Sequence, residues 1–266
     1  MTTAQSNRQI FPDTWKNNFL AALPEQNIVF DCNHDYFIVV SFPEYNLSIN
    51  LINIENRFFP AELIALQNFE LHKGVKLINL WEDVWLSKAK QVIFRVKSLL
   101  GLNKTIHGRK TNCLRLDKAI ADKFLNENHL QGAVSSRYKY GLYYLDELVA
   151  VATFSALREM NHSANYKSIE LIRFAVSGGF SITGGLSKLI NHAKNVHNPA
   201  DIMTYADCDW SSGDAYLKLG FQKVAVLEPQ HFVLDDKLNR ILIKEGSEID
   251  GLQVFNTGSL KFTLKF

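Results

Sequence analysis

The sequence predicts a two-part α/β protein that ends in a β-rich tail. Three observations lead to this prediction. The chain has 266 residues, more than the roughly 100–200 residues of a typical domain. Short apolar runs rich in β-branched residues alternate with segments of helical periodicity. Hydrophobic residues make up 47% and charged residues 21% of the chain, which excludes a disordered or collagen-like protein.

Residues 1–105 are predicted to form a small α/β domain. Apolar, β-branched runs predict strands over 27–31, 35–42, 47–54 and 75–83. Helical spacing predicts helices over 60–74 and 87–101, the first with Pro60 in its first turn and Gly74 at its end. The segment 101–110 has glycines and no apolar periodicity, so it is predicted to be a linker.

Residues 111–227 are predicted to form a mixed-sheet domain, followed by a β-rich extension over 228–266. Strands are expected over 112–116, 138–145, 148–155, 168–177, 201–209 and 221–227, with a hairpin between the second and third. Helices are expected over 117–129, 184–196 and 213–220. Asp117 is suited to cap the first of these helices.

Positive charge is concentrated near the junction of the two parts. Residues 88–110 hold seven basic side chains and no acidic one, although the net charge of the chain is only +2. Such an excess either binds a polyanion or forms a solvated helix face. The candidate nucleic-acid contacts are Lys88, Lys90, Arg95, Lys97, Arg109 and Lys110.

A glycine pair opens the predicted helix over 184–196. Free N–H groups and the helix dipole make such an end an anion site, and glycine lets a phosphate approach the backbone. The candidate cofactor contacts are Ser181, Thr183, Gly184, Gly185 and Ser187. The alternative is a turn in which the glycines serve only close packing.

Four polar residues of the second part are candidates for catalysis. Arg173 is expected to share a strand face with the apolar residues two positions before and after it. It would then either form an internal ion pair with a carboxylate or bind the anion of a ligand. Asp207 ends a strand, where it can act as a base or cap the next helix. Tyr216 can donate a proton or only pack, and His129 can bind a ligand or be structural.

Several protein classes are excluded by what the sequence lacks. Cys32, Cys113 and Cys208 are far apart and form no CxxC pair, which argues against a disulfide framework and a cysteine zinc site. No Walker loop, nucleophile elbow or HExxH motif is present. No membrane helix or signal peptide is recognised, so we expect a cytoplasmic protein.

The order of elements in the second part, β-α-β-β-β-α-β-α-β, resembles the GNAT family of N-acetyltransferases. In that family an acyl-CoA sits where two strands splay apart, with its pyrophosphate at a helix N-terminus. The family pattern Gln/Arg-x-x-Gly-x-Gly/Ala begins here with Ser181 and ends with Leu186, which is a departure. A family tyrosine at the position of Tyr216 often protonates the leaving thiolate.

The segments FLNENHLQG, GLYYLDELVAVATFS, ELIRFA, GGLSKLI and TYADCDWSSGDAYLKLGF, with the tail FNTGSLKF, carry a second resemblance. They resemble the C-terminal domain of phage homing-endonuclease-like proteins over about residues 112–266. More distantly they are similar to the Mom family of phage DNA-modification proteins, which append a carbamoylmethyl group to adenine N6. The resemblance implies that Arg173, Asp207 and Tyr216 line the reaction centre, with His129 at its rim.

The segment HKGVKLINLWEDVWLSKAKQVIFRVKSLLG resembles the closing strand and helix of a PD-(D/E)xK endonuclease domain of the same phage proteins. Aligned on Pro43, the metal-binding acidic positions hold Val39 and Asn50. Valine offers no hard oxygen ligand for a divalent metal. Glu44 and Glu55 lie off the pattern, so the resemblance implies a degenerate nuclease domain that no longer cuts DNA.

We therefore expect a phage-type, acyltransferase-fold enzyme that modifies DNA bases, delivered to DNA by the degenerate nuclease domain. Its partners would be DNA and a small-molecule group donor, with acetyl-CoA or a related acyl donor as the candidate. Tyr205, Trp210 and Tyr216 could stack on a flipped base. The alternatives are a DNA-binding or counter-defence protein without catalysis, a nuclease that uses displaced acids, and an N-acetyltransferase acting on a protein or a small amine.

Overall fold

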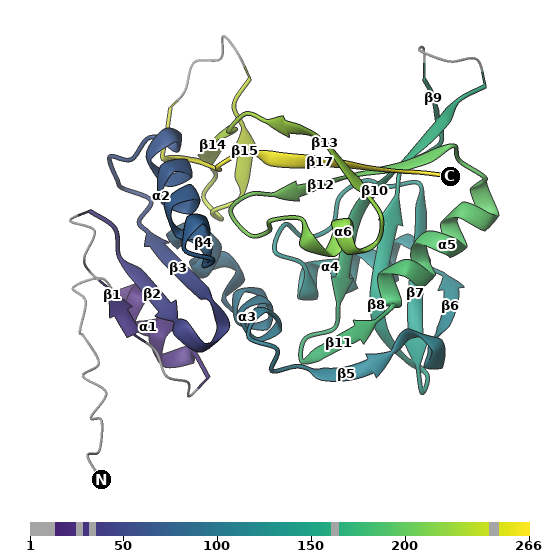
Figure 1. Ribbon diagram of the computed structural model, residues 1–266, viewed down its shortest axis with the longest axis horizontal. Coiled ribbons are helices and arrows are strands. Elements are labelled where there is room, and N and C mark those ends of the chain that lie inside the picture. The colour runs from purple at the N-terminus through teal and green to yellow at the C-terminus, as the bar shows by residue number, and fades with distance from the viewer. Residues whose placement is uncertain (1–13, 25–28, 32–35, 161–164, 245–249) are drawn as a thin grey trace. The chain divides into compact units, whose positions relative to one another are not determined.

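The computed structural model describes residues 14–24, 29–31, 36–160, 165–244 and 250–266 (Figure 1). The chain divides into two compact units, the first with the bounds Met1–Ala89 and His231–Val254, the second with the bounds Lys90–Gln230 and Phe255–Phe266. Both contain helices and sheets, so the predicted α/β class is confirmed. Cys32 and the first two residues of the strand predicted over 27–31 lie outside the described residues.

The first unit is built on a four-stranded sheet of order β1-β2-β3-β4, parallel between β3 and β4 and antiparallel elsewhere. Its elements are α1 (Thr14–Ala22), β1 (Val29–Asp31), β2 (Val39–Phe42), the 3-10 turn η1 (Pro43–Tyr45), β3 (Leu47–Ile52), α2 (Pro60–His72), β4 (Lys76–Trp81), the start of α3 (Glu82–Leu99), β14 (His231–Leu234), β15 (Arg240–Leu242) and β16 (Gln253–Phe255). The last three strands form a small sheet of order β15-β14-β16.

The core of the first unit explains where the sequence prediction succeeded. Every side chain of β3 is buried, as expected for a strand covered on both faces. α2 begins at Pro60, as predicted, because the missing N–H of proline costs nothing in a first helical turn. α1 was not predicted, because its single apolar stripe is short. It buries Trp15 and Phe19, and the Phe19 ring meets the Trp85 ring edge to face at 5.3 Å.

The two positions aligned with nuclease acids lie opposite each other in the first sheet. Val39 of β2 pairs with Asn50 of β3, and both side chains are buried. Asn50 Nδ2 donates a hydrogen bond to Asn79 Oδ1 on β4 at 3.2 Å. Glu44 and Glu55 are exposed. Among the described residues, no group of three or more His, Cys, Asp and Glu side chains is placed to hold a metal ion.

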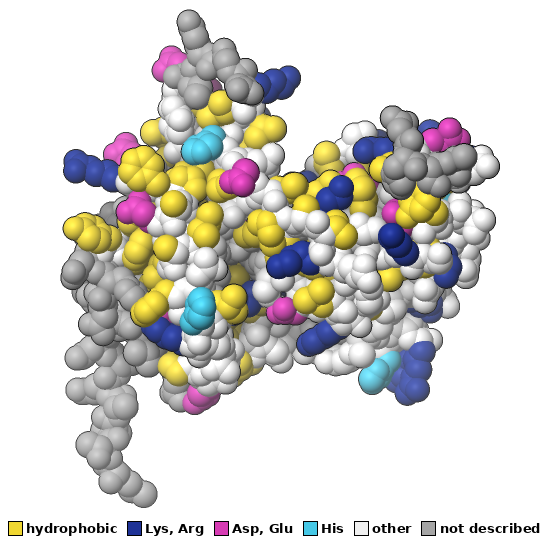
Figure 2. Space-filling view, turned by 45° about the horizontal axis from the view of Figure 1, so that its top comes forward, with side chains coloured by type: hydrophobic (Ala, Val, Ile, Leu, Met, Phe, Trp, Pro, Cys, Tyr) yellow, Lys and Arg dark blue, Asp and Glu magenta, His cyan; other side chains and the backbone are white. Residues whose placement is uncertain are grey.

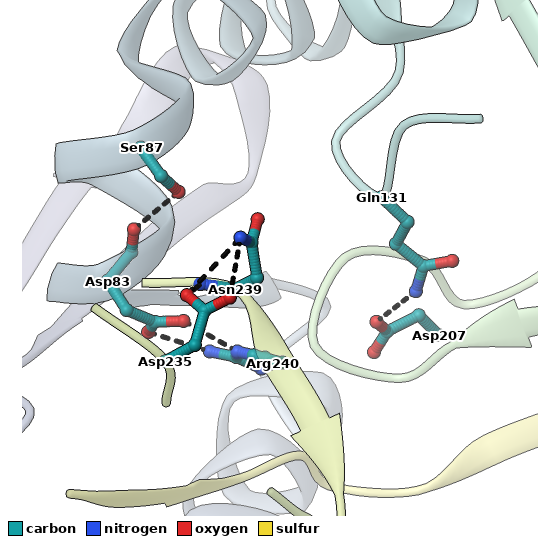
Figure 3. Close-up of polar contacts among 7 residues, drawn as sticks. All are labelled: Asp83, Ser87, Gln131, Asp207, Asp235, Asn239 and Arg240. Carbon is teal, nitrogen blue, oxygen red and sulfur yellow. Dashed lines mark hydrogen bonds and ion pairs between the residues drawn. The ribbon is translucent and has the colours of Figure 1, made fainter. Parts of the chain in front are cut away.

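A buried ion pair ties the 231–254 segment to the rest of the first unit. The guanidinium of Arg240 binds both carboxylate oxygens of Asp83, with Nε at 2.7 Å and Nη2 at 2.9 Å (Figure 3). Asp83 is only 1% exposed, and the Arg240 side chain also lies against the Trp81 and Phe232 rings. Part of the predicted C-terminal extension is therefore an integral piece of the first unit.

The second unit is built on a mixed sheet of order β13-β17-β12-β10-β8-β7-β6, with β9 added beside β10. Its elements are the remainder of α3, β5 (Lys104–His107), the 3-10 turn η2 (Gly108–Lys110), β6 (Asn112–Arg115), α4 (Lys118–Asn128), β7 (Tyr138–Tyr144), β8 (Glu147–Phe154), β9 (Arg158–Glu159), β10 (Lys167–Val176), β11 (Phe180–Thr183), α5 (Gly185–His197), β12 (Asp201–Asp207), α6 (Asp214–Lys218), β13 (Gln222–Leu227) and β17 (Ser259–Lys265). The predicted order of elements is confirmed, with β5, β9 and β11 as additions.

Two helices cover opposite faces of this sheet. Successive residues of a strand point to opposite faces. Val151 of β8 belongs to the apolar cluster around α4, and its neighbours Ala150 and Ala152 belong to the cluster around α5. The helices therefore lie on the two faces of the sheet (Figure 1), and the central strand β8 is buried over most of its length.

A β-bulge in β10 corrects the predicted orientation of Arg173. Leu171 faces Phe154 of β8, and Arg173 faces the next residue, Thr153, so two residues of β10 oppose one of β8. The alternation breaks at this point. Leu171 joins the cluster around α5, whereas Ala175, which has the parity of Arg173, joins the cluster around α4. The simple period of two predicts that Arg173 and Leu171 share a face of the sheet. Because of the bulge, they lie on different faces.

The structure also divides the chain at other points than the boundaries 1–105, 111–227 and 228–266. Residues of the predicted linker form β5, which pairs in parallel with β11. The residues of α3 from Lys90 onward belong to the second unit. β17 lies inside the large sheet between β12 and β13, so the end of the chain is not an appendage. Long-range strand pairing of this kind leaves little local signal in a sequence.

Candidate active site

Two neighbouring strands of the second unit part where the predicted catalytic residues lie. β10 and β12 pair in parallel only between 168–171 and 201–204. Beyond that point β10 continues alongside β8, and β12 continues alongside β17. A cavity of about 360 Å³ opens here. This volume suits a small molecule or the reacting part of a larger one.

All four residues predicted for catalysis line this cavity. His129 follows the end of α4, Arg173 lies at the bulge of β10, Asp207 ends β12 and Tyr216 lies in α6. The rest of the lining is largely apolar and aromatic and includes Leu171, Phe174, Phe180, Leu186, Tyr205 and Trp210. Residues from four separate elements therefore converge at the opening of the sheet.

Asp207 is held as a carboxylate at the cavity wall. Gln131 Nε2 donates to Asp207 Oδ2 at 3.1 Å (Figure 3). The Asp209 N–H donates to Asp207 Oδ1 at 3.0 Å. The alternative role as a cap of the next helix does not hold, because Gly213 occupies the N-cap position of α6. Gln131 was not predicted as a site residue, although it stands two residues after His129.

Two arginines face the cavity. Arg173 donates from Nε to the Gly132 carbonyl at 3.3 Å and from Nη1 to the Ile172 carbonyl at 3.0 Å. Arg95 donates from Nη2 to the Trp210 carbonyl at 3.3 Å. Among the described residues, neither guanidinium forms an ion pair with a carboxylate within 4.0 Å. Burial lowers the pKa of both arginines.

Arg95, one of the predicted nucleic-acid contacts, lies in the cavity lining. It lines the cavity together with Gln91, Phe94 and Ser98 of α3. These positions recur at the spacing of one helix face, beside the face that buries Val92 and Val96. This helical spacing can be read from the sequence. The count of basic residues alone does not show that Arg95 lines a cavity.

The protonation of His129 suits a hydrogen-bond donor rather than a base. Burial, reinforced by the positive charges of Arg173 and Arg95, lowers the pKa of His129 to about 3. The ring is therefore neutral at physiological pH. Its Nδ1 accepts the Gln131 N–H at 3.1 Å, so the ring proton is on Nε2.

Tyr216 keeps its proton at physiological pH. Burial raises the pKa of its phenol, while a hydrogen bond with Thr204 and the charges of Arg95 and Arg173 act in the opposite direction. The ring packs against Phe221 and Phe262, each with a centroid distance of 5.5 Å. Packing fixes the ring, and the phenol remains available as a proton donor.

The predicted cofactor residues are divided between a second cavity and buried positions. A cavity of about 520 Å³ runs along α5 and is lined by Thr183, Gly184 and Ser187, together with Arg109. Ser181 and Gly185 line neither cavity. Ser181 pairs with Thr105 in the two-stranded β5-β11 sheet.

The turn η2 lies close against the backbone at the start of α5. A Cβ placed on Gly108 would lie 3.0–3.1 Å from backbone atoms of Gly184 and Gly185, which shows how closely η2 approaches the helix end. The Lys188 ammonium donates to the Gly108 carbonyl at 3.1 Å and also to the Thr111 carbonyl. The Lys188 ammonium is thus already bound to backbone carbonyls, whereas Gly184 is exposed at the cavity.

The other predicted nucleic-acid contacts differ in exposure. Lys90, Arg109 and Lys110 are exposed, whereas Lys88 and Lys97 are half-buried. Lys88 lies at a kink of α3, where the backbone leaves helical geometry. On the face drawn in Figure 2, Lys and Arg side chains are scattered rather than gathered into one patch.

A comparison with protein-family models and with curated sequences finds no match. The structure is similar to solved acetyltransferases. A GNAT family acetyltransferase from Elizabethkingia anophelis with acetyl-CoA bound gives a TM-score of 0.35 at 17% identity, over 59% of this chain and 99% of that chain. The ribosomal-protein-S18-alanine N-acetyltransferase from Escherichia coli gives 0.38 at 13% identity, over 58% and 93%. The resemblances to phage proteins remain predictions. No helix among the described residues is long and apolar enough to span a membrane.

Proposed function

We propose that the second unit is a transferase that places a small acyl or related group on an amine, and that the amine belongs to a DNA base. The observation that carries the proposal is the cavity at the parting of β10 and β12. It gathers a carboxylate, a protonated phenol and two guanidiniums at one place. Such a set supplies the proton acceptor, the proton donor and the positive charge that amine acylation needs.

These residues account for the protons and the charge of the transfer. The amine nitrogen attacks the acyl carbon of the activated donor, forming a C–N bond while the bond to the leaving group breaks. Asp207 accepts the proton that the nitrogen loses, and Tyr216 gives its proton to the leaving group. Solvent then returns a proton to Tyr216. Arg173 offsets the negative charge that develops on the acyl oxygen.

His129 has a supporting role in this scheme. A neutral ring whose Nδ1 accepts the Gln131 N–H can donate from Nε2 but cannot take a proton there. Gln131 in turn holds Asp207. The 129–132 segment therefore positions the carboxylate and the substrate, and proton removal is left to Asp207.

The aromatic wall of the cavity suits a base as acceptor. Tyr205 is 37% exposed and lines the cavity with the more deeply buried Trp210. A base amine inside a duplex must be extruded to react, which costs a few kcal/mol. Stacking of the extruded base on such rings offsets about 1–3 kcal/mol of this cost.

The donor is a separate question, because η2 lies close against the backbone at the start of α5 and the Lys188 ammonium there is already bound to backbone carbonyls. We propose an activated small-molecule donor whose reacting part enters the cavity, and assign no step to CoA. A second candidate function is N-acetylation of a small amine or a protein. The modest volume of the cavity, about 360 Å³, favours a small acceptor as well as a single base.

Mass spectrometry of nucleosides from cells that express the protein tests the proposal. We expect a modified nucleoside with the wild type and none with Asp207→Asn, which keeps the shape of the side chain. Tyr36→Phe is the control, because Tyr36 is an 81% exposed tyrosine of the first unit that lines neither cavity. Unmodified DNA together with acylated small amines would favour the second candidate. Unmodified DNA with no acylated amine would contradict both.

A further inference from the structure

The cavity holds more positive charge than the proposed reaction uses. Arg173 is assigned to the acyl oxygen, but Arg95 enters the same cavity from α3 and has no assigned task. Its one hydrogen bond is to the Trp210 backbone carbonyl at 3.3 Å, a long and neutral contact. A half-buried guanidinium that gains so little from its neighbours is an electrostatic cost to the protein.

The guanidiniums of Arg95 and Arg173 influence the same neighbouring side chains. Both act on the His129 ring and both act on the Tyr216 phenol. Asp207 is the carboxylate in the lining, and it already accepts hydrogen bonds from Gln131 and the Asp209 backbone. The lining thus combines two cations with one anion, and neutral donors from His129 and Tyr216 face the same space.

We propose that the cavity is a binding site for a small organic anion, a carboxylate or a phosphate monoester, held by Arg95 together with Arg173. The planar fork of a guanidinium matches the oxygens of either group. The apolar and aromatic lining, with Phe94, Phe174 and Phe180, suits a ligand that has a hydrophobic body behind its charged head. The anion rests on the proposed function only for its role as part of the donor. Its binding needs no transfer.

Matched pairs of probes that differ only in charge test this site. Benzoate against benzamide tests a carboxylate, and deoxyadenosine monophosphate against deoxyadenosine tests a phosphate, with binding measured by calorimetry on the full chain. We expect the charged member of at least one pair to bind about tenfold more tightly or better, as a charge-assisted hydrogen bond provides. Equal binding within both pairs would overturn the proposal.

Variants then locate the site. Arg95→Gln should remove about tenfold of the preference for the charged probe, whereas Arg115→Gln should not, since Arg115 is exposed on β6 and outside the cavity. A folded Arg95→Gln protein with an undiminished preference would contradict the assignment. The result also separates the two proposals, because anion binding in a protein that leaves DNA and amines unmodified supports the site and refutes the transfer.

A measurement on the wild type covers the case in which Arg95→Gln fails to fold. A bound anion offsets the two positive charges next to His129, so at neutral pH the saturating charged probe should shift the His129 ring resonances. The neutral probe should shift them less. Ring resonances that the saturating charged probe leaves unchanged would show that the anion binds elsewhere.

Discussion

The two large sheets of this protein use polar residues in different ways. In the first unit, β2, β3 and β4 remain paired along their length, and the buried Asn50 and Asn79 bond to each other inside the sheet. In the second unit, β10 and β12 separate after four paired residues, and Arg173 and Asp207 line the cavity that results. Where strands stay paired, a buried polar side chain can form hydrogen bonds only with neighbouring residues. Where strands separate, a polar side chain can also contact a ligand.

The two units also differ in whether their polar residues face a cavity. The positions aligned with nuclease acids in the first unit hold Val39 and Asn50, both buried. The polar residues of the second unit come from several elements and face one space. Changes to polar residues should therefore affect stability in the first unit and activity in the second.

The largest expected effect is on catalysis. Tyr216→Phe removes the proton donor but keeps the ring that packs on Phe221 and Phe262. We expect the turnover number to fall about 10²–10⁴-fold, the usual contribution of general acid catalysis, with little change in the melting temperature. Single-turnover rates and thermal melts on the same preparations measure both. A variant with normal turnover would show that the phenol is only a packing group.

The next largest effect is on the stability of the first unit. Asp83→Ala leaves the Arg240 guanidinium without its carboxylate, and breaking a buried pair costs about 3–5 kcal/mol. Trp15, Trp81 and Trp85 all lie in this unit, so tryptophan fluorescence in urea follows its unfolding. We expect a lower denaturation midpoint.

A double change separates the lost pair from lost packing. Asp83→Leu with Arg240→Met replaces both charges by apolar groups and should recover much of the stability. Equal destabilisation by the single and the double change would contradict the ion-pair explanation.

His129 makes the stability of the second unit depend on pH. Its pKa of about 3 in the folded protein lies below the usual 6.5, so between these values the unfolded chain binds a proton that the folded chain rejects. Stability should fall as the pH drops from about 6.5 toward 3, by up to about 1.4 kcal/mol per pH unit. Above pH 6.5 the ring is neutral in both states and contributes no slope.

The variant His129→Asn isolates this contribution from the other titrating groups. The difference between the wild-type and variant stability curves should appear only below about pH 6.5. Parallel curves from pH 7 to pH 4 would show that the histidine titrates normally and is not enclosed by the two arginines.

The sequence predicted most elements, and the four residues that it indicated for catalysis all line the cavity, because apolar periodicity and residue type are local signals. It did not predict the bulge that turns Arg173, since a bulge depends on the partner strand. It also did not predict β17 inside the large sheet or the approach of Gly108 to the end of α5. These features arise from pairing between distant segments, and such pairing decides which predicted site residues reach a cavity.

The smallest expected effect concerns DNA affinity, and it tests the reassignment of Arg95. Each phosphate contact contributes about 0.9 to the slope of log affinity against log salt. Changing Lys88, Lys90 and Lys97 together to Gln should flatten the slope by up to about 2.7, if all three contact phosphates. Adding Arg95→Gln should leave the slope unchanged, because that guanidinium faces the cavity. Lys123→Gln with Lys218→Gln, two exposed changes elsewhere in the second unit, serves as the control. A further flattening on loss of Arg95 would place this residue on the DNA and remove it from the anion site.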